Sequence, residues 1–210
     1  MKKAEIEKID KETIDRYNKR YDEFGVDART LGWSGSDSQR VRFITATSHV
    51  QFRNKSVLDI GCGFADFYRH LRMLSNFVNY KGIDINDVLL KNSRVMFPDA
   101  KFENRNILTD NFKERQADIT VMFGLLNFKL KDNLTYTKKM IEEAWKITKE
   151  TLIVDFLSSN LDKNYPKEDA VYYHNPKDVL DICFKLTNDV LLIHDYQSIP
   201  QKEFMVILRR

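Results

Sequence analysis

The segment Val57–Phe67 constrains the fold of this chain more than any other, because it reads as a buried strand, a glycine turn and the start of a helix. Its first residues are mostly β-branched or apolar, as in a central parallel strand. Gly61 and Gly63 then allow a sharp backbone turn and a close approach to a ligand. A helix that begins near Ala65 would direct its free N–H groups toward the same ligand. The segment therefore predicts a binding site at the carboxyl end of this strand.

Two acidic residues limit which ligand this turn can hold. Asp66 stands where a G-x-G-x-x-G dinucleotide motif needs its third glycine, and its carboxylate would repel a pyrophosphate. Asp59 and Asp66 instead suit a ligand that carries positive charge. S-adenosylmethionine has an ammonium and a sulfonium, so we expect S-adenosylmethionine rather than NAD as the cofactor.

From about residue 54 onward the chain resembles the class I S-adenosylmethionine-dependent methyltransferases, whose first motif reads roughly D-x-G-x-G-x-G. Residues 59–65 read D-I-G-C-G-F-A, with Ala65 in place of the third glycine. A second element, residues 82–86, follows at the distance of one βαβ step. Asp84 closes the predicted second strand, where an acid can take both ribose hydroxyls in charge-assisted hydrogen bonds.

The resemblance also implies the remaining residues of the cofactor site. Asn106 would accept a hydrogen bond from the adenine amino group, at a position where the family commonly has an acid. The alternative is that Asn106 caps the short helix after it, and Phe123 could equally belong to the core. The set expected around the cofactor is Asp59, Gly61, Cys62, Gly63, Asp66, Asp84, Ile85, Asn106, Ile107, Phe123 and Gly124.

Aromatic residues near the N-terminus and in the late loop are candidates for the acceptor side of the site. We expect Trp33, Asn127 and Tyr172 to bind the acceptor, and His174, Tyr173 and Asp155 to act in catalysis. A histidine of near-neutral pKa can remove a proton from a nucleophile, and Asp155 would orient that base. The alternatives are that these rings pack the added helices on the sheet and that Asp155 is a buried, hydrogen-bonded acid.

The expected acceptor is a small molecule. Residues 124–128 read G-L-L-N-F, without the Asn/Asp-Pro-Pro-aromatic sequence with which nucleic-acid amino-methyltransferases hold a planar amine. The 34 Lys and Arg against 31 Asp and Glu leave a net charge of +3, too small to indicate a polyanionic partner. No Cys/His cluster has metal-ligand spacing, so no metal is expected. RNA or protein methylation, and a non-catalytic cofactor-binding role, remain alternatives.

Length and composition predict one domain in a reducing compartment. The 210 residues fit a single methyltransferase domain, with an N-terminal helical segment at 1–53 and a core at 54–210. Two cysteines, Cys62 and Cys183, give no disulfide framework. The chain shows neither a signal peptide nor an apolar run of the roughly 18 residues that a membrane helix needs, so we expect a cytoplasmic protein. The oligomeric state is open.

Strand and helix patterns alternate along the core. Strands are expected at about 56–60, 80–84, 101–104, 117–123, 151–157, 190–196 and 204–208, with helices between them and one or two helices at 2–24. This order predicts an α/β fold, a three-layer sandwich with a Rossmann-like sheet and its ligand at the carboxyl ends of the strands. The resemblance further implies seven strands, mostly parallel, with an antiparallel last strand inserted beside the fifth.

Overall fold

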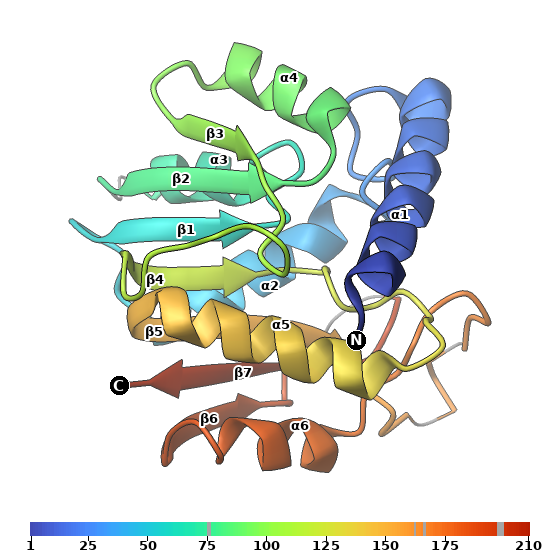
Figure 1. Ribbon diagram of the computed structural model, residues 1–210, viewed down its shortest axis with the longest axis vertical. Helices are drawn as coiled ribbons and strands as arrows, with labels where there is room; N and C mark the ends of the chain where they lie inside the picture. The colour runs from blue at the N-terminus through green and yellow to red at the C-terminus, as the bar shows by residue number, and fades with distance from the viewer. Residues whose placement is uncertain (75–76, 162, 166, 197–199) are drawn as a thin grey trace.

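The computed structural model describes residues 1–74, 77–161, 163–165, 167–196 and 200–210, and its centre is one seven-stranded sheet (Figure 1). The strands are β1 (Ser56–Ile60), β2 (Asn79–Asp84), β3 (Lys101–Asn104), β4 (Ala117–Met122), β5 (Thr148–Leu157), β6 (Asp189–Ile193) and β7 (Glu203–Arg209). The helices are α1 (Lys3–Phe24), α2 (Ser36–His49), α3 (Asp66–Met73), α4 (Asp87–Met96), α5 (Asn133–Ile147) and α6 (Pro176–Cys183).

The sheet has the predicted topology. Its strand order is β3-β2-β1-β4-β5-β7-β6. The pairs β1/β2, β1/β4, β2/β3 and β4/β5 are parallel, whereas β7 runs antiparallel to both of its neighbours, β5 and β6. The last strand therefore lies inserted beside β5, and the expected mostly parallel seven-stranded sheet is confirmed.

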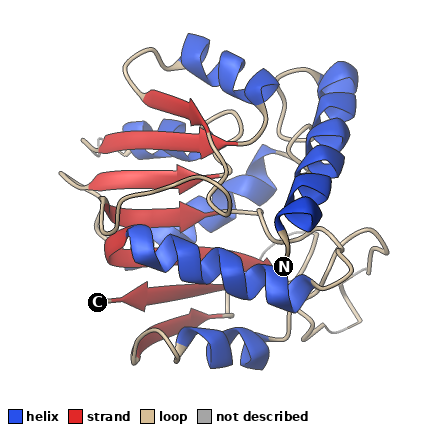
Figure 2. Ribbon diagram, viewed as in Figure 1, coloured by secondary structure: helices blue, strands red, loops and turns tan. Residues whose placement is uncertain are grey.

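Helices cover both faces of the sheet and make a three-layer sandwich (Figure 2). Successive strand residues point to opposite faces, so neighbours on β1 enter different cores. Leu58 packs in the core beneath α5 and α6, and Val57 packs in the core with residues of α2 and α3. The alternation explains why β1 is buried on both faces, as a central parallel strand must be.

Several element boundaries differ from the predicted ones. The segment predicted as one or two helices is the single 22-residue helix α1. Strand β4 ends at Met122 rather than 123, because Gly124 turns the chain away with a φ of 67°. Strand β5 starts three residues earlier than predicted, at Thr148, and β6 ends earlier, at Ile193. Of these shifts, only the one-residue shift of β4 moves a strand end that faces the predicted site.

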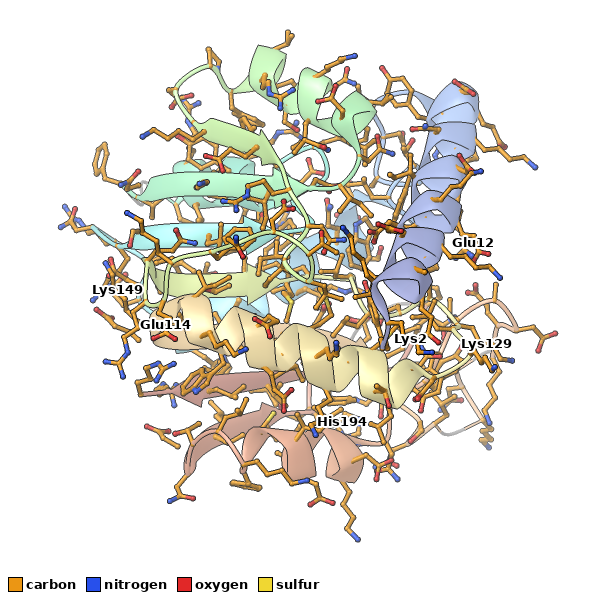
Figure 3. The ribbon with its side chains drawn as sticks, in the orientation of Figure 1. Lys2, Glu12, Glu114, Lys129, Lys149 and His194 are labelled. Atoms are coloured by element: carbon orange, nitrogen blue, oxygen red, sulfur yellow. The ribbon has the colours of Figure 1, made fainter. Side chains whose placement is uncertain are left out.

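Helix α1 runs along the carboxyl ends of the parallel strands, where the arrowheads of β1, β2 and β4 point toward it (Figure 1). After β2, the Asn86 side-chain amide donates to Asn18 Oδ1 on α1 at 2.9 Å. After β4, the Phe128 ring meets Tyr17 edge-on, with centroids 5.6 Å apart. The charged side of α1 faces outward, as Glu12 shows (Figure 3). The N-terminal helix therefore covers the edge of the sheet at which a ligand is expected.

Candidate active site

A cavity at the carboxyl edge of the sheet brings together all eleven residues expected around the cofactor, from Asp59 on β1 to Gly124 after β4. Residues of the N-terminal segment, 1–53, complete the lining of this cavity. Asp10 and Tyr17 on α1 line the cavity, as do Leu31 and Trp33 from the loop between α1 and α2. We call this space the first cavity. The topology explains its place, because β1 and β4 are the central strands at which the strand order reverses.

The glycine turn of the first cavity has no room for side chains. Gly61 and Gly63 adopt left-handed φ angles of 73° and 52°. A Cβ at Gly61 would lie 2.6 Å from the Leu125 side chain, and one at Gly63 would lie 2.9 Å from that of Leu31. Ala65, the residue in place of the third family glycine, also has a left-handed φ of 59°, at a cost on the order of 1–2 kcal/mol for a non-glycine residue.

Asp84 is fixed at the end of β2 by two backbone donors. Its Oδ2 accepts from the Gly63 N–H at 3.0 Å, and its Oδ1 accepts from the Asn86 N–H at 2.8 Å. Burial raises the pKa of the Asp84 carboxyl, and these backbone hydrogen bonds oppose that rise. The carboxylate therefore links β2 to the glycine turn and presents its remaining lone pairs to the first cavity.

Asp59 lies deeper, with an exposed fraction of 3%. Its Oδ2 accepts a hydrogen bond from the Tyr80 hydroxyl at 2.6 Å. Burial, with smaller contributions from the charges of Asp84 and Asp66, raises the pKa of Asp59 to about 7 despite this hydrogen bond. With Asp10, four carboxylates thus line one cavity, and a cationic ligand would relieve their repulsion and favour their ionised forms.

Asn106 takes part in a local turn as well as lining the first cavity. Its Oδ1 accepts from the Leu108 N–H at 2.7 Å, as in the capping alternative. Its Nδ2 donates to Asp10 Oδ2 on α1 at 2.6 Å. Asp10 is a cavity carboxylate that the sequence did not indicate, because its partner lies 96 positions away and the helical pattern of α1 marks no ligand residue. Burial raises the pKa of Asp10.

A second cavity adjoins the first. The two share Tyr17, Leu31, Trp33 and Gly124, which we call the shared wall. Trp33 and Asn127, both expected on the acceptor side, line the second cavity. The other acceptor-side candidates, Tyr172, Tyr173, His174 and Asp155, line neither cavity.

His174 does not lie where the catalytic hypothesis needs it. Its backbone N–H donates to the Leu157 carbonyl at 2.8 Å, which turns the ring into the interior, where 1% of the residue is exposed. There Nε2 lies 2.9 Å from Thr137 Oγ1, and the rings of Phe156 and Tyr172 pack edge-on against the imidazole. Burial lowers the pKa of His174 to about 4. This position corrects the expectation of a near-neutral base beside the acceptor.

Tyr173 and Asp155 support the cavities from behind. The Tyr173 hydroxyl donates to Gln201 Oε1 at 2.8 Å and accepts from the Glu168 N–H at 2.9 Å, and Gln201 and Glu168 both line the second cavity. Asp155 Oδ1 accepts from the Gly124 N–H at 2.6 Å, which holds part of the shared wall. Asp155 is therefore the buried, hydrogen-bonded acid of the alternative interpretation. His174, which Asp155 was expected to orient, instead lies at hydrogen-bond distance from Thr137.

A buried ion cluster, which the sequence does not predict, supports the shared wall. Arg42 on α2 forms an ion pair with Asp155 at 3.2 Å and another with Glu203 on β7, and all three side chains are at most 3% exposed. The Arg42 guanidinium also stacks on the Trp33 ring, 4.1 Å from its centroid. Because Asp155 holds Gly124 and Arg42 holds Trp33, the cluster fixes two of the four shared-wall residues.

Two proteins of similar sequence are both named as putative methyltransferases. No protein-family model matches the chain. Over 163 residues, 74% of this chain and 93% of the other, the chain is 24% identical to a putative methyltransferase of Mycobacterium tuberculosis. Over 162 residues, 73% of this chain, it is 27% identical to a putative methyltransferase of invertebrate iridescent virus 6, and it spans 58% of that protein's length.

Solved structures of methyltransferases resemble the chain at the level of the fold. Magnesium protoporphyrin IX methyltransferase from Synechocystis PCC 6803, solved with bound S-adenosylhomocysteine, superposes with a TM-score of 0.65 at 14% identity and covers 93% of each chain. A methyltransferase from Methanosarcina mazei gives a TM-score of 0.60 at 16% identity, covering 79% of this chain and 96% of the other. These likenesses confirm, at the level of the fold, the resemblance that the glycine motif indicates: the chain has the fold of the class I S-adenosylmethionine-dependent methyltransferases.

Proposed function

We propose that the protein transfers a methyl group from S-adenosylmethionine to an oxygen or nitrogen atom of a small molecule. The observation that carries this proposal is the pair of cavities that meet at Tyr17, Leu31, Trp33 and Gly124. Carboxylates line the first cavity, and α1 with its following loop contributes to both. A donor in one cavity and an acceptor in the other would meet at the shared wall.

The residues of the first cavity fit S-adenosylmethionine. This cofactor supplies a methyl carbon activated by a positively charged sulfur. Asp59 and Asp66 provide negative charge beside the glycine turn, and Asp84 offers its remaining lone pairs to the ribose hydroxyls. Asp10 and Asn106 present a carboxylate and an amide for the adenine amino group. The left-handed turn of Gly61 and Gly63 lets the backbone approach the ligand closely.

The residues of the second cavity act by alignment and exclusion of water. The aromatic side chains of Tyr17, Trp33 and Phe128 line it and would desolvate an acceptor. Asn127 lines the same space, with its Oδ1 held by the Leu157 N–H at 3.2 Å. The residues that line the two cavities, within the described part of the chain, include no histidine. This proposal therefore assigns the reaction to proximity and orientation rather than to a histidine base.

The small-molecule acceptor is distinguished from RNA or protein by where the methyl group goes. No described helix has the length and apolar character for a membrane crossing. The protein should be incubated with methyl-labelled S-adenosylmethionine and a cell extract, which is then separated into small molecules, RNA and protein. We expect label in the small-molecule fraction. Label confined to RNA or protein contradicts the proposed acceptor, and failure to bind S-adenosylhomocysteine in calorimetry contradicts the proposed cofactor.

A further inference from the structure

We propose that the second cavity selects acceptors that carry an anionic group, a carboxylate or a phosphate, and that Arg20 binds this group. The inference rests on the proposed methyl transfer and adds the chemical class of the acceptor. Arg20 lies near the end of α1, and its side chain lines the second cavity. The anion would lie apart from the methylated atom, which must reach the shared wall.

Within the described residues, one nitrogen of the Arg20 guanidinium is buried without a partner, although the residue as a whole is partly exposed. Its Nη1 is buried and has no hydrogen-bond partner among the described residues. No carboxylate within the described ranges lies at ion-pair distance from Arg20, whereas seventeen other ion pairs are formed there. A guanidinium stays charged at all physiological pH values, and an unpaired charge is costly to bury. An anionic ligand would supply the missing partner.

The loop after α1 confines this side chain. Gly32 has a left-handed φ of 86°, and a Cβ built on it would lie 2.6 Å from Arg20 Nη1. The absent side chain thus leaves room for the guanidinium directly against the loop backbone. The same loop contributes Leu31 and Trp33 to the shared wall. The position of Arg20 is therefore linked to the wall at which transfer is proposed to occur.

The other charged groups of the second cavity leave Arg20 as the site for an anion. Arg42 already pairs with Glu203 and with Asp155 behind the wall. Glu168 is exposed and accepts from Gln201 Nε2 at 2.7 Å. Because Glu168 is negative and has no cationic partner among the described ion pairs, it would repel an anion from its own part of the cavity. An anionic acceptor would thus be oriented by attraction to Arg20 and repulsion from Glu168.

The cavity also offers an aromatic surface to the rest of the acceptor. Tyr17, Trp33 and Phe128 contribute rings to its lining. Aromatic and apolar surface binds a planar body, while a few placed polar groups set its orientation. Benzoate and phenyl phosphate combine a ring with each of the two anions, and benzamide is the neutral counterpart of benzoate. These three compounds are suitable probes.

The test is calorimetric titration of the three probes into the full chain saturated with S-adenosylhomocysteine. We expect benzoate or phenyl phosphate to bind at least about tenfold more tightly than benzamide, as hydrogen bonds to a charged partner imply. The preferred anion then identifies carboxylate or phosphate. Arg20→Gln should abolish the preference, and Arg20→Lys should keep part of it, since lysine retains the charge but lacks the planar fork.

Lys19→Gln is the matched control, because it removes one positive charge from an exposed neighbouring position on α1. It should leave the anion preference unchanged. Arg20→Gln should unfold at a temperature no lower than the parent and should bind S-adenosylhomocysteine equally well, because it removes only an unpaired charge. The proposal is overturned by equal binding of benzamide and both anions, by absence of anion binding, or by an anion preference that survives in Arg20→Gln. Loss of S-adenosylhomocysteine binding by the parent protein would instead contradict the proposed function.

Discussion

Asp84→Asn tests how one carboxylate joins the fold to the cofactor. Asp84 accepts two backbone hydrogen bonds, one through each carboxylate oxygen, from Gly63 at 3.0 Å and from Asn86 at 2.8 Å. Asparagine has one acceptor oxygen, so one of these N–H groups would face an NH₂ group instead. Leaving it without an acceptor should lower the free energy of unfolding by about 1–3 kcal/mol. The resemblance alone predicts only a loss of ribose binding.

The same substitution should weaken cofactor binding. Charge-assisted hydrogen bonds to the ribose contribute roughly 1.5–3 kcal/mol, so affinity for S-adenosylhomocysteine should fall about ten- to a hundredfold. Calorimetry measures the affinity and urea denaturation measures the stability. Asp87→Asn is the control, because it removes a half-exposed carboxylate whose ion pairs with Lys91 and Arg94 contribute little. A folded Asp84→Asn protein with parental affinity would refute the assignment of Asp84 to the cofactor.

Three further predictions concern the cavities and the buried histidine. Gly124→Ala should cost on the order of 1–3 kcal/mol of stability and weaken S-adenosylhomocysteine binding, because its φ is 67° and a Cβ would lie 2.5 Å from the Trp33 ring; thermal unfolding and calorimetry that match the parent would contradict this packing. Asp59 has a pKa of about 7, and a cationic ligand should lower it, so S-adenosylmethionine binding near pH 7 should release protons, seen as a dependence of the calorimetric heat on the buffer. Asp59→Asn should remove that dependence, and its persistence would exclude Asp59 as the source. For His174, whose pKa falls from 6.5 to about 4, the unfolded chain binds a proton between these values and the folded chain does not, so stability should fall by up to about 3 kcal/mol as pH drops through this window. His174→Asn should flatten that slope in urea denaturation while cofactor affinity stays unchanged, and an unaltered slope would assign the acid sensitivity to other groups.

The lining of the first cavity was predictable because its information is local. A strand of mostly β-branched or apolar residues, two glycines and flanking acids occur within eleven residues. The predicted limits of β1 and β3 match the structure. Asp84 follows from the same reasoning, since an acid at the end of the next parallel strand must lie beside the first turn. The glycine turn after β1 and the acid at the end of β2 come together once β1 and β2 are neighbours, and the fold class predicts that pairing.

The second cavity and the ion cluster behind it were less predictable because their contacts join distant segments. The partners of Arg42 lie on β5 and β7, and no local pattern selects them from other acids. The sequence places His174 and Tyr173 near the acceptor by chain position alone. The backbone of His174 instead bonds to Leu157, and its ring lies buried beside Thr137 and Phe156. Arg20 belongs to a charged helix in which the sequence does not separate a cavity residue from its exposed neighbours.

The charges of the two cavities imply where each reactant binds in the proposed reaction. Asp59, Asp66 and Asp84 make the first cavity attractive to a cation, while Arg20 gives the second cavity an unpaired positive charge. A cationic donor and an anionic acceptor would each be repelled from the other's binding group and attracted to its own. Between them lies an uncharged wall, so desolvation there strengthens the attraction between donor and acceptor. Opposite charges would then orient the two reactants toward each other, and the proton that an O–H or N–H acceptor loses would pass to solvent.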